Sequence, residues 1–199
     1  MPNHLYLKLV LVTLFAASVV PAFAQVVPAA TGGGGLTIAA GGGVSTYQMD
    51  FFPYGREWGG TLWVDGDLNL GPRFLQGLGV EAEARDLSLD RSASLPNDFR
   101  TDTLGGGPMY TWHFHRLRPY VKGIISYGSL DVYKHSYHFT WTEYAPGGGV
   151  EYRTFGNVFV RADYEYQAWF KVFGKNYTLD PNGWTFGAVY QFGHPHLRH

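Results

Sequence analysis

Hydrophobic and polar residues alternate without interruption from Val158 to Phe170, in the segment VFVRADYEYQAWF. Val, Ala and Tyr occupy every even position from 158 to 168, while Arg161, Asp163 and Glu165 occupy odd positions. Successive side chains of a β-strand point to opposite faces, so this segment predicts a strand with one apolar-aromatic face and one charged face. In a soluble sheet the apolar face would be the core. In a membrane barrel it would meet lipid, and the charges would line the interior.

Similar patterns predict seven further strands, each bounded by residues that favour turns: Leu36–Tyr47, Glu57–Leu70, Gln76–Leu87, Phe99–Phe114, Pro119–Leu130, Glu143–Arg153 and Gly183–Phe192. Pro108 is a weak point of the fourth strand, tolerable only at a bulge or an edge-like position. The predicted connections alternate between long and short, with the long ones at Gln48–Arg56, Ser88–Asp98, Asp131–Thr142 and Lys171–Asn182. An even strand number with alternating connections is typical of bacterial outer-membrane barrels. The predicted fold is all-β, an eight-stranded antiparallel up-and-down transmembrane β-barrel.

The first residues predict a signal peptide. Lys8 provides a basic start, and the apolar stretch from 9 to 20 is too short to span a bilayer as a stable helix. Ala22 and Ala24 form an A-x-A cleavage site, with Gln25 as the new N-terminus; the alternative is a buried N-terminal helix. No second apolar stretch of about eighteen residues follows, so a membrane protein with this sequence must be a barrel. The predicted organisation is a signal peptide (1–24), a flexible lead-in (25–35), a barrel (36–192) and a tail (193–199).

The charged faces of several predicted strands carry both signs, and we expect them to meet inside the barrel. An eight-stranded barrel has an interior just wide enough for side chains to fill, so interlocked acidic and basic groups would form a plug. The alternative is the solvated outer face of a soluble barrel. The expected interior charge cluster consists of Glu81, Glu83, Arg85, Glu151, Arg153, Arg161, Asp163 and Glu165.

Aromatic residues, which make up 17% of the chain, favour the membrane interpretation. They fall on faces opposite charges or glycines, and many lie near predicted strand ends, where membrane barrels carry interfacial girdles. A soluble lipid-carrying barrel would instead bury them around a ligand. The expected girdle residues are Trp58, Tyr110, Trp112, Phe114, Tyr127, Tyr152, Tyr164, Tyr166, Trp184, Tyr190 and Phe192.

Three segments resemble the fifth, sixth and seventh strands of the OmpA-like/opacity-type outer-membrane β-barrel family: RPYVKGIISYG (118–128), PGGGVEYR (146–153) and VRADYEYQAWF (160–170). The last predicted strand resembles the terminal strand that the outer-membrane insertion machinery recognises, with Trp184, Phe186, Tyr190 and Phe192 as the signal. It departs from that pattern because GHPHLRH follows Phe192. The resemblance implies a location in the outer membrane of a Gram-negative-type bacterium, with outer-membrane lipid and the insertion machinery as partners.

Within that family we expect a structural or surface-interaction role and a monomer. A surface ligand would bind through the loops, whose candidate aromatics are Phe51, Phe52, Tyr54, Tyr133, Tyr137, Phe139 and Trp141. The alternative is a narrow porin for small solutes. The net charge of −1 shows no basic excess, and we expect no nucleic-acid partner.

A lipid-modifying enzyme is a further alternative. His135, Ser136 and His138 lie near Glu143 in the sequence, but the His-x-Ser-Asn pattern of lipid A deacylases is missing. We therefore expect no enzymatic activity and no cofactor. The tail contains His194, His196 and His199 without a carboxylate, which we interpret as incidental composition, so we expect no metal site.

Overall fold

The computed structural model describes residues 36–49, 55–68, 75–89, 99–132, 137–170 and 179–192. The chain divides into the units Met1–Gly34 and Gly35–His199, and all the described residues belong to the second. The predicted signal peptide, the lead-in and the C-terminal tail therefore lie outside the described residues. In the described part of the chain, no helix is long and apolar enough to cross a membrane.

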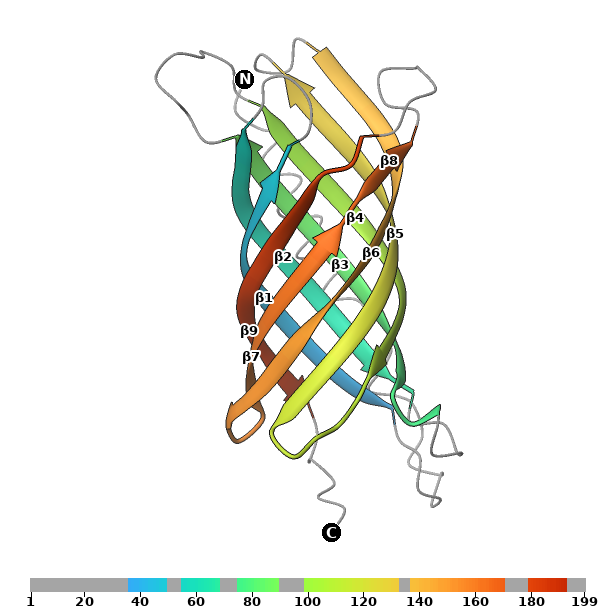
Figure 1. Ribbon diagram of the computed structural model, residues 1–199, viewed down its shortest axis with the longest axis vertical. Coiled ribbons are helices and arrows are strands. Elements are labelled where there is room, and N and C mark those ends of the chain that lie inside the picture. The colour runs from blue at the N-terminus through green and yellow to red at the C-terminus, as the bar shows by residue number, and fades with distance from the viewer. Residues whose placement is uncertain are drawn as a thin grey trace. The chain divides into compact units, whose positions relative to one another are not determined.

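The described residues form one closed antiparallel sheet (Figure 1). β1 pairs with β2 on one side and with β9 on the other, which closes the barrel. β8 continues β7 after a break at Gln167, and both pair with β6. With β7 and β8 counted as one strand, eight strands form the barrel, as predicted. The strands are β1 (Thr37–Gln48), β2 (Arg56–Asp67), β3 (Leu78–Leu89), β4 (Arg100–Thr111), β5 (Leu117–Val132), β6 (Tyr137–Phe155), β7 (Val158–Tyr166), β8 (Ala168–Phe170) and β9 (Asn182–Phe192).

The strands are staggered around the barrel. Following paired residues once around from Thr37 leads back to β1 at Tyr47, ten positions further along the strand. This stagger accounts for the tilt of the strands in Figure 1 and leaves an interior that side chains can fill. We call the end at which β1 begins and β9 ends the terminal end, and the opposite end the distal end.

Side chains alternate between an apolar outer wall and a polar interior, as predicted. Leu62 and Ile125 on the outer wall are 65% and 62% exposed, whereas Glu57, Asp65 and Lys122 on the same strands are buried. Exposed aromatics gather toward both strand ends. Those toward the distal end are Trp58, Tyr127, Tyr166 and Trp184, and those toward the terminal end are Trp112, Phe114, Tyr152, Tyr190 and Phe192.

The β5–β6 hairpin is longer than predicted. The segment 131–142 was expected to be a loop, but pairing continues to Val132 and Tyr137. Outward-facing Thr140 and Thr142 gave the segment a polar, loop-like composition, although β-branched Thr suits a strand. Trp141, expected to be exposed, points inward and is only 3% exposed.

Other loop predictions have different outcomes. Residues 68–77 separate β2 from β3, and only 133–136 separate β5 from β6, so the expected alternation of long and short connections is wrong. Phe139 is partly buried, and the remaining loop aromatics lie outside the described residues, apart from Tyr137, which begins β6. Those outside are Phe51, Phe52, Tyr54 and Tyr133.

Two prolines interrupt pairing without shifting its register, because proline has no backbone N–H. Pairing of β4 with β5 stops after Gly106 and resumes at Met109, on either side of Pro108. Pro146 separates the residues of β6 that pair with β8 from those that pair with β7. The break between β7 and β8 at Gln167 is therefore explained by Pro146 on the neighbouring strand.

Candidate functional site

Lys122 of β5 is the centre of an ion-pair network inside the barrel. Its Nζ lies 2.8 Å from Glu81 Oε1, 3.1 Å from Glu83 Oε2, 3.1 Å from Asp163 Oδ2 and 3.1 Å from Glu165 Oε2. All five side chains are buried. One ammonium group thus bridges two carboxylates of β3 and two of β7.

Two arginines connect the same carboxylates. Arg85 of β3 contacts Glu83 at 2.9 Å and Glu165 at 3.0 Å. Arg161 of β7 contacts three carboxylates, in β2, β3 and β7: Asp65 at 3.3 Å, Glu81 at 2.6 Å and Asp163 at 2.9 Å. Each guanidinium therefore joins strands that are not neighbours in the sheet. We call Asp65, Glu81, Glu83, Arg85, Lys122, Arg161, Asp163 and Glu165 the interior network.

Aromatic rings hold the two guanidinium groups in place. Arg161 lies 4.7 Å from the ring centroid of Trp63 and 4.4 Å from that of Tyr120. Arg85 lies 4.5 Å from the ring of Tyr47. The Tyr47 hydroxyl donates to Glu165 at 3.1 Å, and the Tyr120 hydroxyl donates to Asp163. Planar guanidinium groups stack on aromatic faces, so the rings restrict the arginines while the carboxylates bind them.

The expected charge cluster matches this network in part. Glu81, Glu83, Arg85, Arg161, Asp163 and Glu165 all belong to it, and Glu151 reaches its edge, 3.9 Å from Arg161. The prediction is wrong for Arg153, whose Nε donates to the Gly156 carbonyl at 2.7 Å in the β6–β7 turn. Arg153 still pairs in regular register with Phe159, but it lies two residues from the end of β6, where the turn carbonyl is its partner.

Lys122 and Asp65 belong to the interior network although neither is in the predicted charge cluster. Lys122 shares an inward face with Tyr120, Ile124 and Ser126, and strict alternation along the predicted fifth strand would have identified it. The residues on either side of Lys122 in the sequence are uncharged, so the local pattern did not indicate a charged face on this strand. Its four partners come from β3 and β7, and only the barrel closure brings them to it.

Acidic groups outnumber basic groups inside the described barrel. Three buried cations, Arg85, Lys122 and Arg161, face eight buried carboxyl groups. These carboxyl groups belong to Glu57, Asp65, Glu81, Glu83, Glu143, Glu151, Asp163 and Glu165.

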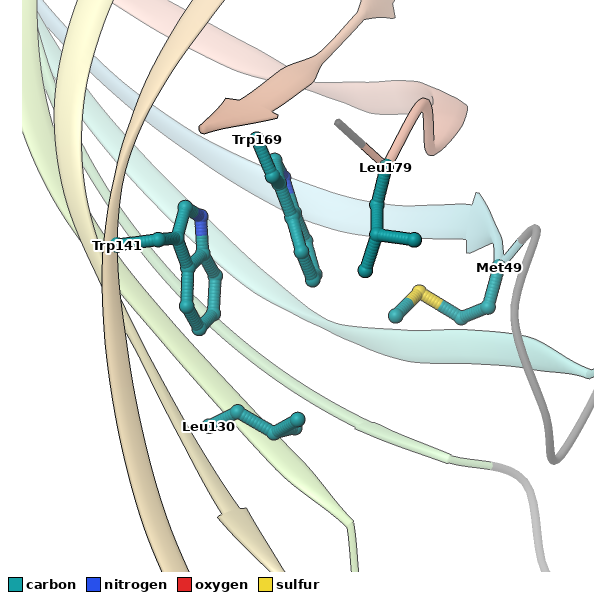
Figure 2. Packing of buried hydrophobic residues seen from close by; sticks show 5 residues of the cluster. All are labelled: Met49, Leu130, Trp141, Trp169 and Leu179. Carbon is teal, nitrogen blue, oxygen red and sulfur yellow. The ribbon is translucent and has the colours of Figure 1, made fainter. Parts of the chain in front are cut away.

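An apolar cluster lies at the distal end of the barrel interior (Figure 2). Trp141 and Trp169 are stacked, with ring centroids 4.1 Å apart and an interplanar angle of 25°. Phe99 and Phe139 pack against this cluster. A smaller cluster of Trp63, Phe159 and Val189 is buried elsewhere in the interior. We call the first cluster the distal lid; it consists of Met49, Leu130, Trp141, Trp169 and Leu179.

Hydrogen bonds connect the distal lid to the interior network. The Trp169 indole donates to Gln167 Oε1 at 2.9 Å, and Gln167 Nε2 donates to Glu165 Oε1 at 3.0 Å. On the other ring of the stack, the Trp141 indole donates to Glu143 Oε2 at 3.2 Å. The lid is therefore connected to Glu165 of the interior network and to Glu143, which lies outside that network.

Of the residues considered for an enzyme, the described ones, His138 and Glu143, lie on opposite faces of β6. His138 is exposed at the distal rim, with Nδ1 2.7 Å from Asp131 Oδ1. Glu143 is fully buried inside the barrel, whereas His138 on the same strand is exposed. His135 and Ser136 lie outside the described residues, as do the histidines of the tail. Within the described ranges, no group of three or more His, Cys, Asp or Glu residues could hold a metal ion.

The residues of the expected insertion signal all lie on the outer face of β9. Trp184, Phe186, Tyr190 and Phe192 are between 49% and 56% exposed, and β9 pairs with β1 and β7. They therefore form one continuous apolar stripe at the strand that closes the barrel. Recognition of this stripe by the insertion machinery stays a prediction.

Comparisons with known proteins agree with this geometry. A comparison with curated proteins found no match. Among solved structures, Neisserial surface protein A aligns with a TM-score of 0.60 and 16% identity over 79% of this chain and 99% of its own. Ail, the attachment invasion locus protein of Yersinia pestis, in complex with the heparin analogue sucrose octasulfate, aligns with a TM-score of 0.52 and 20% identity over 80% and 99%. A major outer membrane protein from Thermus thermophilus aligns with a TM-score of 0.53 and 15% identity over 79% of this chain and 100% of its own.

The TM-scores show that the fold is shared, and at such low identities they show the fold alone. The sequence itself matches the family described as outer membrane protein beta-barrel domain over residues 9–192. Because this match covers most of the chain, the protein belongs to the outer membrane protein beta-barrel domain family, and its apolar outer wall contacts the lipid of the bacterial outer membrane.

Proposed function

We propose that this chain is a closed outer-membrane barrel with a structural or surface-interaction role, and that it has no enzymatic activity. The observation that carries the proposal is the Arg85–Glu165 ion pair at 3.0 Å. β3 and β7 lie on opposite sides of the closed sheet, so this pair crosses the lumen. Lys122 and the distal lid are also buried inside the barrel, which favours a plugged barrel over a narrow porin.

A surface role would place the distal end outside the cell, because outer-membrane barrels have their turns and termini on the periplasmic side. The heparin analogue bound to the Yersinia protein is a polyanion. The described distal rim of this chain offers Asp86 and Asp102 on either side of Arg100, at 2.6 Å and 3.3 Å. This rim suits a neutral or basic partner better than a polyanion.

We expect no discrete conductance steps when the refolded chain is inserted into a planar bilayer. The ion pairs across the lumen must separate before an ion can pass, and separating buried pairs costs several kcal/mol. A heat-dependent gel shift shows that the inserted protein is folded, and a known porin in the same bilayer shows that channels are detected. Reproducible steps from demonstrably folded protein would replace the closed barrel with the small-solute porin.

The orientation can be tested with two threonines on one strand. Thr140 and Thr154 are both exposed and lie near opposite ends of β6. The chain has no cysteine, so Thr140→Cys and Thr154→Cys each introduce a single thiol. A membrane-impermeant maleimide added to intact cells should label the first variant, and the second only after lysis. Labelling of Thr154→Cys alone on intact cells would reverse the orientation and move the proposed surface away from the distal end.

A further inference from the structure

Two carboxyl groups inside the barrel have no ion-pair partner among the residues that the structure describes. Glu57 and Glu143 are 1% and 0% exposed. One oxygen of Glu57 accepts a hydrogen bond from Thr101 Oγ1 at 2.9 Å, and one oxygen of Glu143 accepts from Trp141 Nε1 at 3.2 Å. The second oxygen of each is buried and has no hydrogen-bond partner among the described residues. Both groups differ in this from the carboxylates around Lys122.

One of the two carboxyl groups contacts the distal lid directly, and the other is connected to it through one residue. Glu143 binds the indole of Trp141, which is half of the tryptophan stack. Glu57 binds Thr101, and Thr101 is the cross-strand partner of the lid residue Leu130. The groups therefore occupy the boundary between an apolar layer and the interior network, on strands β2 and β6.

The surroundings of Glu143 do not favour its ionised form. The charged groups that face it are Arg85 and Glu83 from β3 and Glu165 from β7. Its neighbours Ser126 on β5 and Trp169 on β8 carry no charge. The one guanidinium in this set is already bound by the two other carboxylates.

Glu57 has even less support for a charge. The one titratable group among its cross-strand neighbours is the phenol of Tyr47 on β1, since Leu89 on β3 and its hydrogen-bond partner Thr101 on β4 are uncharged. Burial of an ionised carboxylate without a basic partner is far more costly than burial of the neutral acid. A neutral acid also has an O–H group that can donate a hydrogen bond.

We propose that Glu57 and Glu143 are neutral acids in the closed barrel, and that their ionisation loosens the distal lid, so that closure of the barrel responds to pH. Each carboxyl group releases one proton to water as the lid separates, and the carboxylate that forms becomes hydrated. The closed form therefore holds more protons than the loosened form, and linkage requires that rising pH favours loosening. The inference rests on the lid and the two acids, and does not depend on a surface partner.

The stacked tryptophans provide a direct signal for the test. Two indoles 4.1 Å apart should give an exciton couplet in circular dichroism, which Trp141→Phe should abolish. The full chain, refolded into lipid vesicles, would be titrated from about pH 5 to about pH 9, below the range in which an exposed tyrosine ionises. We expect the couplet to weaken reversibly as the pH rises, while the gel shift still reports a folded barrel.

Neutral replacements decide the cause. Glu57→Gln and Glu143→Gln mimic the neutral acid, so both variants should fold, and the double variant should keep its couplet across the whole range. Asp131→Asn removes the partner of the exposed His138 and should leave the transition unchanged, which separates the lid from rim titration. A couplet that does not change with pH in the natural chain would overturn the proposal. So would a transition that survives in the double variant, or Gln variants that cannot fold.

These outcomes are separate from those for the proposed function. Conductance steps that occur equally at every pH would contradict the closed barrel, while the couplet would still report on the lid. A barrel that stays silent with a couplet independent of pH would support closure and reject the titratable lid.

Discussion

Replacing Lys122 with Met should leave most of the protein molecules unfolded at neutral pH. Four carboxylates lie within 3.1 Å of its ammonium group, and the substitution removes their shared cation while filling a similar volume. Loss of one partner from a buried ion pair typically costs about 3–5 kcal/mol, because the remaining charge stays buried. Here Arg85 and Arg161 remain, but they already bind the same acids. We therefore expect a loss at the upper end of that range, measured by urea unfolding in lipid vesicles.

An exposed arginine provides the matched control. Arg100 at the distal rim binds Asp86 and Asp102, and its side chain is 41% exposed. Exposed ion pairs contribute about 0–1 kcal/mol, so Arg100→Met should leave the free energy of unfolding nearly unchanged. Equal losses in the two variants would mean that the interior network does not hold the barrel together.

The response to acid should distinguish the Lys122 variant from the natural chain. In the natural chain, protonation of the carboxylates breaks their ion pairs with Lys122, so acidification should lower stability. In Lys122→Met, protonation removes the repulsion among unpaired carboxylates, so the same acidification should restore part of the lost stability. A fall of equal size in both proteins would show that repulsion is not the cause of the defect.

Much of the fold follows from local alternation, because a closed barrel repeats one simple rule on every strand. The strand Val158–Phe170 was predicted from that rule. In the structure the strand is interrupted at Gln167 alone, and the alternation of inward and outward residues continues through the break. The rule failed where composition competed with it. Thr140 and Trp141 belong to a paired strand, but polar outward residues near a predicted loop made the segment look irregular. Where outward-facing residues near a strand end are polar, the outward and inward faces no longer differ in polarity, and the pattern that predicts a strand disappears.

The site was predictable only in part, because its contacts cross the lumen. Alternation places Glu81 and Glu165 on inward faces, but it does not state that Lys122 from β5 lies between them. That meeting depends on barrel closure and on the stagger of ten residues between Thr37 and Tyr47. Arg153 fails for a different reason: it obeys the alternation, but it lies at the end of β6, where the carbonyl of Gly156 in the turn is its partner.

Glycines at the closing seam of the barrel are the second place where a single side chain should have a large effect. Gly43 of β1 pairs with Gly187 of β9, and both face the interior. A Cβ atom at Gly43 would lie 2.8 Å from the Cα of Gly187 and would also collide with the Phe186 carbonyl oxygen. A Cβ atom at Gly187 would lie 2.7 Å from Cη2 of Trp63, so that indole already fills the space beside the seam.

We therefore expect Gly43→Val to block closure between β1 and β9. Overpacking of a core costs about 1–3 kcal/mol when side chains can move, and more where the clash is with backbone, as it is here. Gly60→Val is the matched control. Gly60 faces outward on the neighbouring strand, and the nearest atom to an added Cβ is 3.9 Å away. Valine there suits a strand that faces lipid, so the control should be at least as stable as the natural chain.

The heat-dependent gel shift and urea unfolding in vesicles would measure both variants. If Gly43→Val folds as well as Gly60→Val, β1 and β9 can move apart enough to accept a side chain. The packing of Trp63 beside the seam would then not determine the distance between these two strands. If Gly43→Val alone fails, the first and last strands must approach without side chains before the barrel can close. A seam held open would also disturb the ion pairs across the lumen, because Trp63 lies beside the seam and Arg161 stacks on its ring at 4.7 Å.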